Sequence, residues 1–153
     1  MLQRLINTRD DVTLAIVRLV LGGVMFAHGA QKMLGWFGGY GFTGTMGFFE
    51  SLHIPAAFAF LAIAAEFFGG IGLLLGLLGR VAAFGITVNM LVAILTVHLP
   101  NGFFMNWDGT QKGEGFEYHL LAIGLGLALI VQGAGKWSLD ALLAMSSQKP
   151  THS

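Results

Sequence analysis

The stretch of residues 56–99 decides the fold, and it reads AAFAFLAIAAEFFGGIGLLLGLLGRVAAFGITVNMLVAILTVHL. Among Asp, Glu, Lys and Arg it holds only Glu66 and Arg80. A membrane-spanning helix needs about 20 consecutive, mostly apolar residues. The stretch therefore predicts two spans, 56–78 and 81–99, which a short Gly-Arg turn joins into an antiparallel hairpin.

Two further apolar stretches, 12–34 and 116–133, flank this hairpin. Of all residues 55% are hydrophobic and 10% are charged, whereas about a quarter are charged in an average soluble domain. The sequence thus predicts an all-α integral membrane protein, a bundle of four helices forming a single transmembrane domain over residues 1–153. The lipid bilayer is its main partner, and we expect residues 146–153 to be a disordered tail.

Basic residues are unevenly distributed between the two sides of this bundle. One side has Arg4, Arg9, Arg80, Lys136 and Lys149, and the other has Lys32 and Lys112. The positive-inside rule then places both chain ends in the cytoplasm. The net charge is zero and the basic residues are dispersed, so nucleic acid is not an expected partner.

Both long connections lie on the outer side in this topology. In residues 35–55, the side chains of Phe42, Met46, Phe49 and Leu52 recur at helical spacing, which predicts a short helix lying in the membrane interface. The second connection, PNGFFMNWDGTQKGEG, combines turn residues with aromatic side chains suited to the headgroup layer. We expect residues 138–145 to form a short amphipathic extension on the cytoplasmic side.

Glu66 is the residue that the membrane should tolerate least. Ionisable side chains at the centre of a span cost about 2.5–3.5 kcal/mol, so Glu66 must be protonated, paired or facing a polar cavity. We expect Arg18 to be its ion partner and Asn89, at a similar depth, to hydrogen-bond it. Two interpretations remain open: a structural pair that joins the first two spans, or a direct functional role.

A candidate ligand site lies between the outer halves of the first two spans. A stripe of small and charged residues runs along one face of the first span: Arg18, Gly22, Met25, Gly29 and Lys32. The residues expected to converge on a ligand are His28, Gly29, Lys32, Glu66 and Gly70, below Trp36. Alternatively, the glycines let the two helices pack tightly and leave no cavity between them.

Histidines near the outer ends of three spans invite a metal or haem interpretation. Ideal helical angles oppose it, because His98 is nine residues from Asn89, half a turn out of phase, and Glu117 diverges from His119. We therefore expect that His28, His98 and His119 do not share one site, and neither a metal site nor a haem is predicted. The sequence contains no cysteine, which excludes thiol chemistry by this chain.

Several motifs together resemble the DoxX family of small bacterial membrane proteins. They are RLVLGGVMFAHGAQKMLGWFGG at 18–39, GFTGTMGFFE at 41–50, AEFFGGIGLLLGLLGRVAA at 65–83, FEYHLL at 116–121 and GAGKWSLD at 133–140. The resemblance implies a multi-pass protein of the bacterial inner membrane, which in some members is linked to quinone-coupled oxidation of thiosulfate. In others it implies oxidative-stress complexes, and more distant relatives act as cargo receptors or assembly chaperones.

Two functions therefore compete. In the first, the chain is the membrane subunit of a quinone-linked oxidoreductase: Glu66, His28 and Lys32 are the candidate catalytic residues, and a redox partner protein supplies the electrons. The candidate ligand-binding residues are Arg18, Gly29, Gly70, Asn89 and Trp36. In the second, the chain is a non-catalytic assembly or binding factor for a protein or a small hydrophobic ligand. Solute transport and homo-oligomerisation remain further alternatives.

Overall fold

The computed structural model of the chain describes residues 2–146, and these are helical with irregular connections. Three helical stretches are long and apolar enough to cross a membrane: α2 (Val12–Leu34), α4 (Ala56–Leu75) and the continuous stretch Gly79–Asn101. The fourth, α6 (Glu117–Gln132), is apolar but shorter. The predicted all-α membrane bundle is thereby confirmed.

The third span changes its helix type along its length. It begins as α5 (Gly79–Ala93), continues as the π-helix η2 (Ile94–His98) and ends in the 3₁₀ turn η3 (Leu99–Asn101). A π-helix has a wider turn than an α-helix and often occurs at functional sites. Here it changes the direction in which the last side chains of the span point.

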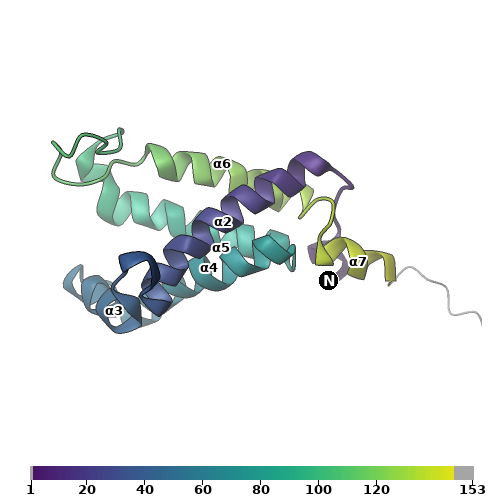
Figure 1. Cartoon of the computed structure of the whole chain (residues 1–153), viewed down its shortest axis with the longest axis horizontal. Coiled ribbons are helices and arrows are strands. Elements are labelled where there is room, and N and C mark those ends of the chain that lie inside the picture. The colour runs from purple at the N-terminus through teal and green to yellow at the C-terminus, as the bar shows by residue number, and fades with distance from the viewer. Residues whose placement is uncertain (1, 147–153) are drawn as a thin grey trace, which may run out of the picture.

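Short helices cover the two ends of the bundle (Figure 1). The loop end carries η1 (Trp36–Gly38), the predicted helix in the first loop, which is α3 (Gly41–Ser51), and the connection between η3 and α6. The turn end carries α1 (Leu2–Ile6), which the sequence did not predict, and α7 (Leu139–Ser146). The predicted tail lies outside the described residues except for Ser146, which ends α7.

Local sequence explains where the main helices start and stop. The Asp11 carboxylate accepts a hydrogen bond from the Thr13 amide at 2.7 Å and so caps the start of α2. Gly35 and Gly76 adopt left-handed conformations with φ of 75° and 66°, and they end α2 and α4. As a result α4 stops three residues before the expected end of the second span, and Gly79 and Arg80 belong to α5 rather than to the turn.

Helices α2 and α4 form the closest packing in the bundle. A Cβ atom on Gly29 would lie 2.4 Å from the amide nitrogen of Phe67, and one on Gly70 would lie 2.5 Å from that of Phe26. The two backbones therefore touch, as small residues allow between membrane helices. Farther toward the turn end, α5 and α6 pack on this pair around a core that includes Leu73, Ile86 and Leu129.

A polar network closes the turn end. The Asp140 carboxylate accepts hydrogen bonds from the amides of Leu78 and Gly79, each at 2.8 Å, and so caps the start of α5. Burial raises the pKa of the Asp140 carboxyl, whereas these two amide hydrogen bonds act in the opposite direction. At the end of α6 the Arg80 guanidinium donates to the carbonyls of Ile130 and Val131. Both caps satisfy backbone groups that helix ends leave unpaired.

Candidate ligand-binding site

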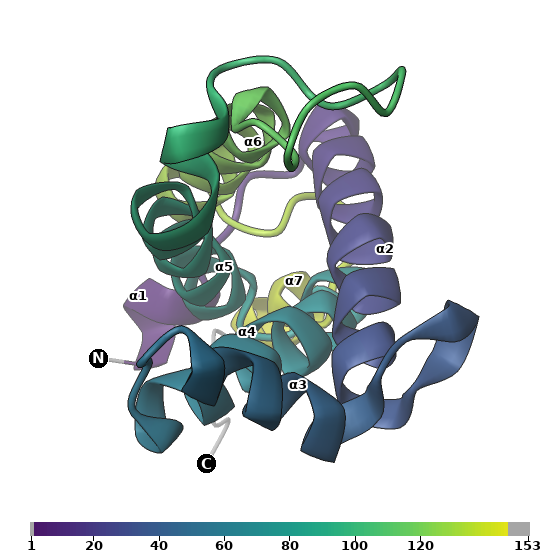
Figure 2. The same ribbon diagram turned by 90° about the vertical axis from the view of Figure 1, so that its left-hand side faces the viewer.

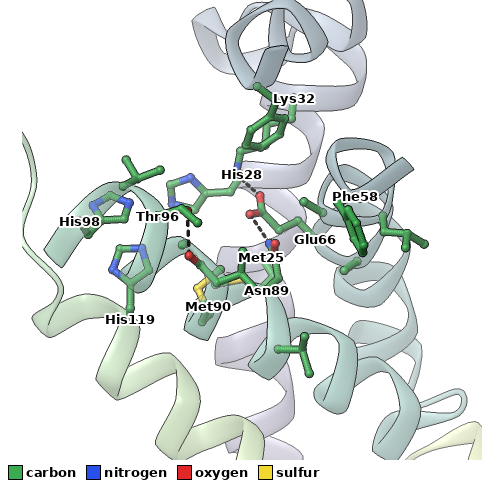
Figure 3. Close-up of a pocket in the computed structure, with 18 of the residues that line it drawn as sticks. Met25, His28, Lys32, Phe58, Glu66, Asn89, Met90, Thr96, His98 and His119 are labelled. Carbon is green, nitrogen blue, oxygen red and sulfur yellow. Dashed lines mark hydrogen bonds and ion pairs between the residues drawn. The ribbon is translucent and has the colours of Figure 1, made fainter. Parts of the chain in front are cut away.

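A cavity of about 770 Å³ lies at the loop end of the bundle. Helices α2 to α6 surround this region when it is viewed from that end (Figure 2). Helices α3, α4 and α5 contribute apolar lining: Phe48, Phe58, Leu61, Phe84, Val88 and Val92. Other residues of the spans contribute polar lining: His28, Lys32, Glu66, Asn89, His98 and His119. The cavity thus has an apolar side and a polar side, and Figure 3 shows Phe58 across from His98 and His119.

The polar side is centred on Glu66, which is only 4% exposed. Lys32 forms an ion pair with its Oε2 atom, and Asn89 donates a hydrogen bond of 2.9 Å to its Oε1 atom. Figure 3 shows the two partners reaching the carboxylate from different helices. The predicted hydrogen bond between Asn89 and Glu66 is confirmed. Because Lys32 lies on α2, Glu66 on α4 and Asn89 on α5, the cluster ties three spans together.

Lys32 is able to reach Glu66 because it lies on the last turn of α2. Its side chain remains 30% exposed, so the aliphatic stem covers apolar surface while the ammonium group reaches the carboxylate. An ion pair at such a site contributes little net stability, since desolvation offsets much of the attraction. The ion pair is therefore better explained by what it can do in the cavity than by its stability. It places a cation and a carboxylate at the same cavity.

The prediction that Arg18 pairs with Glu66 is wrong. Arg18 is 2% exposed, and it donates hydrogen bonds to the carbonyls of Leu73 and Leu74 at 2.8 and 2.6 Å. It also donates to the carbonyl of Ala134 at 2.9 Å. The reason is the early end of α4 at Gly76, which leaves carbonyls that the guanidinium can satisfy. Arg18 does not line the cavity.

The glycines expected to line a site between the first two spans instead form a helix contact. At Gly29 and Gly70 the backbones of α2 and α4 are in contact, and neither glycine lines the cavity. Trp36 lies outside it as well, with half of its side chain exposed, and packs edge-on against Phe26. The cavity lies beside this contact: α2 contributes His28 and Lys32, α4 contributes Glu66, and the lining extends to α5 and α6. Of the eight predicted site residues, the cavity lining includes His28, Lys32, Glu66 and Asn89.

The expectation that three histidines cannot share a site is wrong too. His28, His98 and His119 all line the cavity, and the rings of His98 and His119 are 4.0 Å apart between centroids. The error comes from the π-helix at Ile94–His98, because each residue in a π-helix advances by less than the 100° of an α-helix. The divergence of Glu117 from His119 does hold: Glu117 accepts from the Met105 amide in the loop at 2.9 Å.

Tyr118 is a polar residue of the cavity that sequence reasoning missed, as it missed Thr45 and Glu114. Its ring lies 5.9 Å from that of His28, and its hydroxyl, like Nδ1 of His119, has no hydrogen-bond partner among the described residues. Such buried polar atoms are costly unless water or a ligand satisfies them. The motif FEYHLL could have indicated Tyr118, because it places two polar aromatic residues at the start of an apolar helix.

A sequence model of the DoxX family matches residues 13–99, more than half of the chain. The chain belongs to the DoxX family. The matched residues include Lys32, Glu66 and Asn89 together with His98, whereas Tyr118 and His119 lie beyond the match. The polar cluster around Glu66 thus falls within the DoxX region, and the fourth span adds to it from outside.

Three relatives of this DoxX protein align over most of their length. The "Putative oxidoreductase CatD" of Bacillus subtilis is 29% identical over 80% of this chain and 82% of its own. The "Uncharacterized membrane protein Rv3486" of Mycobacterium tuberculosis is 34% identical over 92% and 87%. The "Inner membrane protein YqjF" of Escherichia coli is 29% identical over 88% and 94%. No solved structure matches the chain. With its apolar helices, the protein is a DoxX membrane protein.

Proposed function

We propose that this DoxX protein is the membrane subunit of a quinone-linked oxidoreductase complex in the bacterial inner membrane, and that its cavity holds the quinone headgroup. One observation carries the proposal: a buried carboxylate, paired with a lysine, faces a cavity whose other side is apolar. A ligand with a polar head and an apolar tail fits such a site. The volume of about 770 Å³ is within the usual range for small-molecule sites.

The apolar side of the cavity supports entry of the ligand from the lipid. Phe58 and Leu61 of α4 are 64% and 58% exposed, and Phe84 of α5 is 60% exposed. These residues line the cavity and also present surface where a membrane span meets lipid. A lipid-soluble ligand would therefore reach the polar side without crossing water.

The polar side supplies the groups that quinone reduction needs. Reduction of a quinone to a quinol takes up two electrons and two protons. The Lys32 ammonium or the His28 ring would donate a hydrogen bond to a headgroup oxygen, and Glu66 would exchange a proton there. The sequence contains no cysteine for an iron–sulfur cluster, and the described residues contain no strand–loop–helix unit for a nucleotide, so a redox partner protein would supply the electrons. The name of CatD as an oxidoreductase agrees with this assignment.

Thermal unfolding of the purified protein in lipid nanodiscs tests the proposal. A short-tailed ubiquinone or menaquinone analogue at about 100 times its Kd should stabilise the wild-type protein by about 2.7 kcal/mol. Relative to its own ligand-free state, Glu66→Gln should lose most of this shift, and Lys32→Met should lose it too. The matched control is Trp36→Phe, which changes a residue outside the cavity and should keep the full shift.

The outcomes separate the two candidate functions. If the quinone analogue stabilised Glu66→Gln and Lys32→Met as much as the wild-type protein, the quinone would not bind in this cavity. No stabilisation by any quinone, together with a protein or peptide that copurifies with the chain, would instead assign the protein to assembly or binding without redox chemistry.

A further inference from the structure

The histidine pair of the cavity is built from two different spans. His98 ends the π-helix η2, and His119 lies in the first turn of α6. Nδ1 of His98 lies 2.9 Å from the backbone carbonyl of Glu114. A carbonyl only accepts hydrogen bonds, so Nδ1 of His98 carries the proton, and in the neutral ring Nε2 is free to accept another. The pair therefore contains a nitrogen ready to take up a proton.

Burial increases steadily along this pair toward Glu66. Glu114 in the loop is exposed, His98 is half-buried, His119 is 6% exposed and Glu66 is 4% exposed. All four line the same cavity. Because Nδ1 of His119 has no protein partner among the described residues, water in the cavity is the available partner. The four residues thus mark a polar route from the loop surface to the buried carboxylate.

Apart from Lys32, whose side chain is 30% exposed, the other sides of the cavity are mainly apolar. Met25 and Met90 line it toward the turn end, and both belong to the apolar core of the bundle. Toward α3, α4 and α5 the lining includes phenylalanine, leucine and valine side chains. The titratable groups that share the cavity with the pair are His28 and Lys32 from α2, Glu66 from α4, Tyr118 from α6 and Glu114 from the loop.

We propose that the His98–His119 pair passes protons between the water at the loop end and the Glu66 carboxylate. Nε2 of His98 takes a proton from water and passes it to His119. His119 releases it through cavity water to an oxygen of Glu66, and both rings return to the neutral form. One proton moves in each passage and no electron moves. The inference rests on the proposed function, in which Glu66 exchanges protons with a ligand that arrives from the lipid on the opposite side.

Infrared spectroscopy after a rapid drop in pH tests the role of the pair. In protein reconstituted into nanodiscs, protonation of Glu66 is the carboxyl signal that Glu66→Gln abolishes. Its rate should fall at least about tenfold in His98→Gln and in His119→Gln, because glutamine can hydrogen-bond but cannot carry a proton at these pH values. The control is His53→Gln, which changes an exposed histidine outside this cavity.

The amplitude of the same signal separates transport from structure. If the histidines only supported the fold, the amplitude and the unfolding temperature would change while the rate in folded protein stayed the same. An unchanged rate in His119→Gln would overturn the inference. The absence of any Glu66 signal in the wild-type protein would also overturn it, since Glu66 would then exchange no proton.

A second experiment tests the water route itself and uses the absence of cysteine from the chain. Val97 is half-buried and lines the cavity, whereas Leu95 on the same π-helix is 69% exposed and does not line it. A membrane-impermeant maleimide added on the loop side should label Val97→Cys at least about tenfold faster than Leu95→Cys, because a thiolate forms in water and not in lipid. Thr110→Cys, in the exposed loop, reports that the reagent reaches this side.

Equal, slow labelling at both positions would show that no water enters beside the pair and would overturn the inference. Neither experiment uses a quinone. Failure of quinone binding alone would therefore remove the proposed ligand, while the infrared and labelling results would still decide the proton route.

Discussion

The pairing of Glu66 with Lys32 is the residue-scale feature on which the candidate site depends. The carboxylate is almost fully buried, and its two oxygens are held by side chains from two other helices. A buried ion pair is rarely retained for stability alone, because apolar residues of the same size often serve as well. The burial of this charged pair therefore favours a functional role for it.

Removing one member of the pair should cost more than removing both. Glu66→Gln can keep the hydrogen bond to Asn89 but leaves the Lys32 ammonium without its counter-charge, so we expect a loss of about 1–3 kcal/mol. Because the Lys32 side chain is 30% exposed, it can turn toward the membrane interface. We therefore expect the loss of stability to lie at the lower end of this range. The double variant Glu66→Gln with Lys32→Met should recover most of the loss. Unfolding in a series of detergents measures the stability of the two single variants and the double variant. A double variant less stable than either single variant would contradict the prediction.

Sequence alone could place Glu66 and Asn89 together but not their third partner. The depth of each residue in the membrane follows from counting along its span. This depth was enough to predict the hydrogen bond between Asn89 and Glu66. The partner of Arg18 depends instead on where α4 ends, since that end supplies the carbonyls of Leu73 and Leu74. Boundaries of helices are poorly fixed by sequence patterns.

At the scale of elements, the contact between α2 and α4 decides where the cavity lies. The glycines of both helices remove the space between them, so the cavity lies beside the contact and extends toward α5 and α6. Tight packing of the first two spans through their glycines was one of two alternatives that the sequence left open. The position of His98 could not be predicted, because no residue pattern in ILTVH marks the π-helix that turns it into the cavity.

The glycine contact predicts different outcomes for two glycines of α2, Gly29 and Gly23. Gly29→Ala places a methyl group where an ideal Cβ lies 2.4 Å from backbone atoms of α4, so the helices must separate, at a cost of about 1–3 kcal/mol. Gly23→Ala is the matched control, because nothing lies within 4 Å of its Cβ. Alanine is the better helix former by up to about 1 kcal/mol, so this variant should be neutral or more stable. Thermal unfolding compares them, and equal stability of the two variants would refute close packing at Gly29.

At the scale of the whole molecule, the fold was the most predictable property. Runs of apolar residues long enough to cross a bilayer leave little choice but helices, since backbone groups in lipid must be satisfied within the segment. Residues 2–146 bear this out with three long apolar helices and a shorter fourth. Orientation in the membrane rests on a separate argument, the uneven distribution of lysine and arginine.

The charge asymmetry predicts that the turn end faces the cytoplasm. A reporter enzyme that works only in the cytoplasm should be active when fused after Ser153, and a tag inserted near Thr110 should be labelled from outside intact cells. A reporter fused after Arg80 is less suitable as a control, because the Arg80 guanidinium donates hydrogen bonds to carbonyls at the end of α6 and the fusion would disturb them. Labelling of the Thr110 tag only after cell lysis would reverse the orientation and place the histidine pair on the cytoplasmic side.

The hydrogen bonds of Arg18 carry a consequence for biosynthesis. Arg18 belongs to the first of the spans to be translated, yet one of its acceptors, the carbonyl of Ala134, follows the fourth span. Until α4 supplies the carbonyls of Leu73 and Leu74, the guanidinium must stay hydrated near the membrane surface, which its position about 9 Å from the start of α2 permits at 1.5 Å per residue. A nascent chain that stalls before residue 134 would therefore leave Arg18 with only part of its hydrogen-bond acceptors.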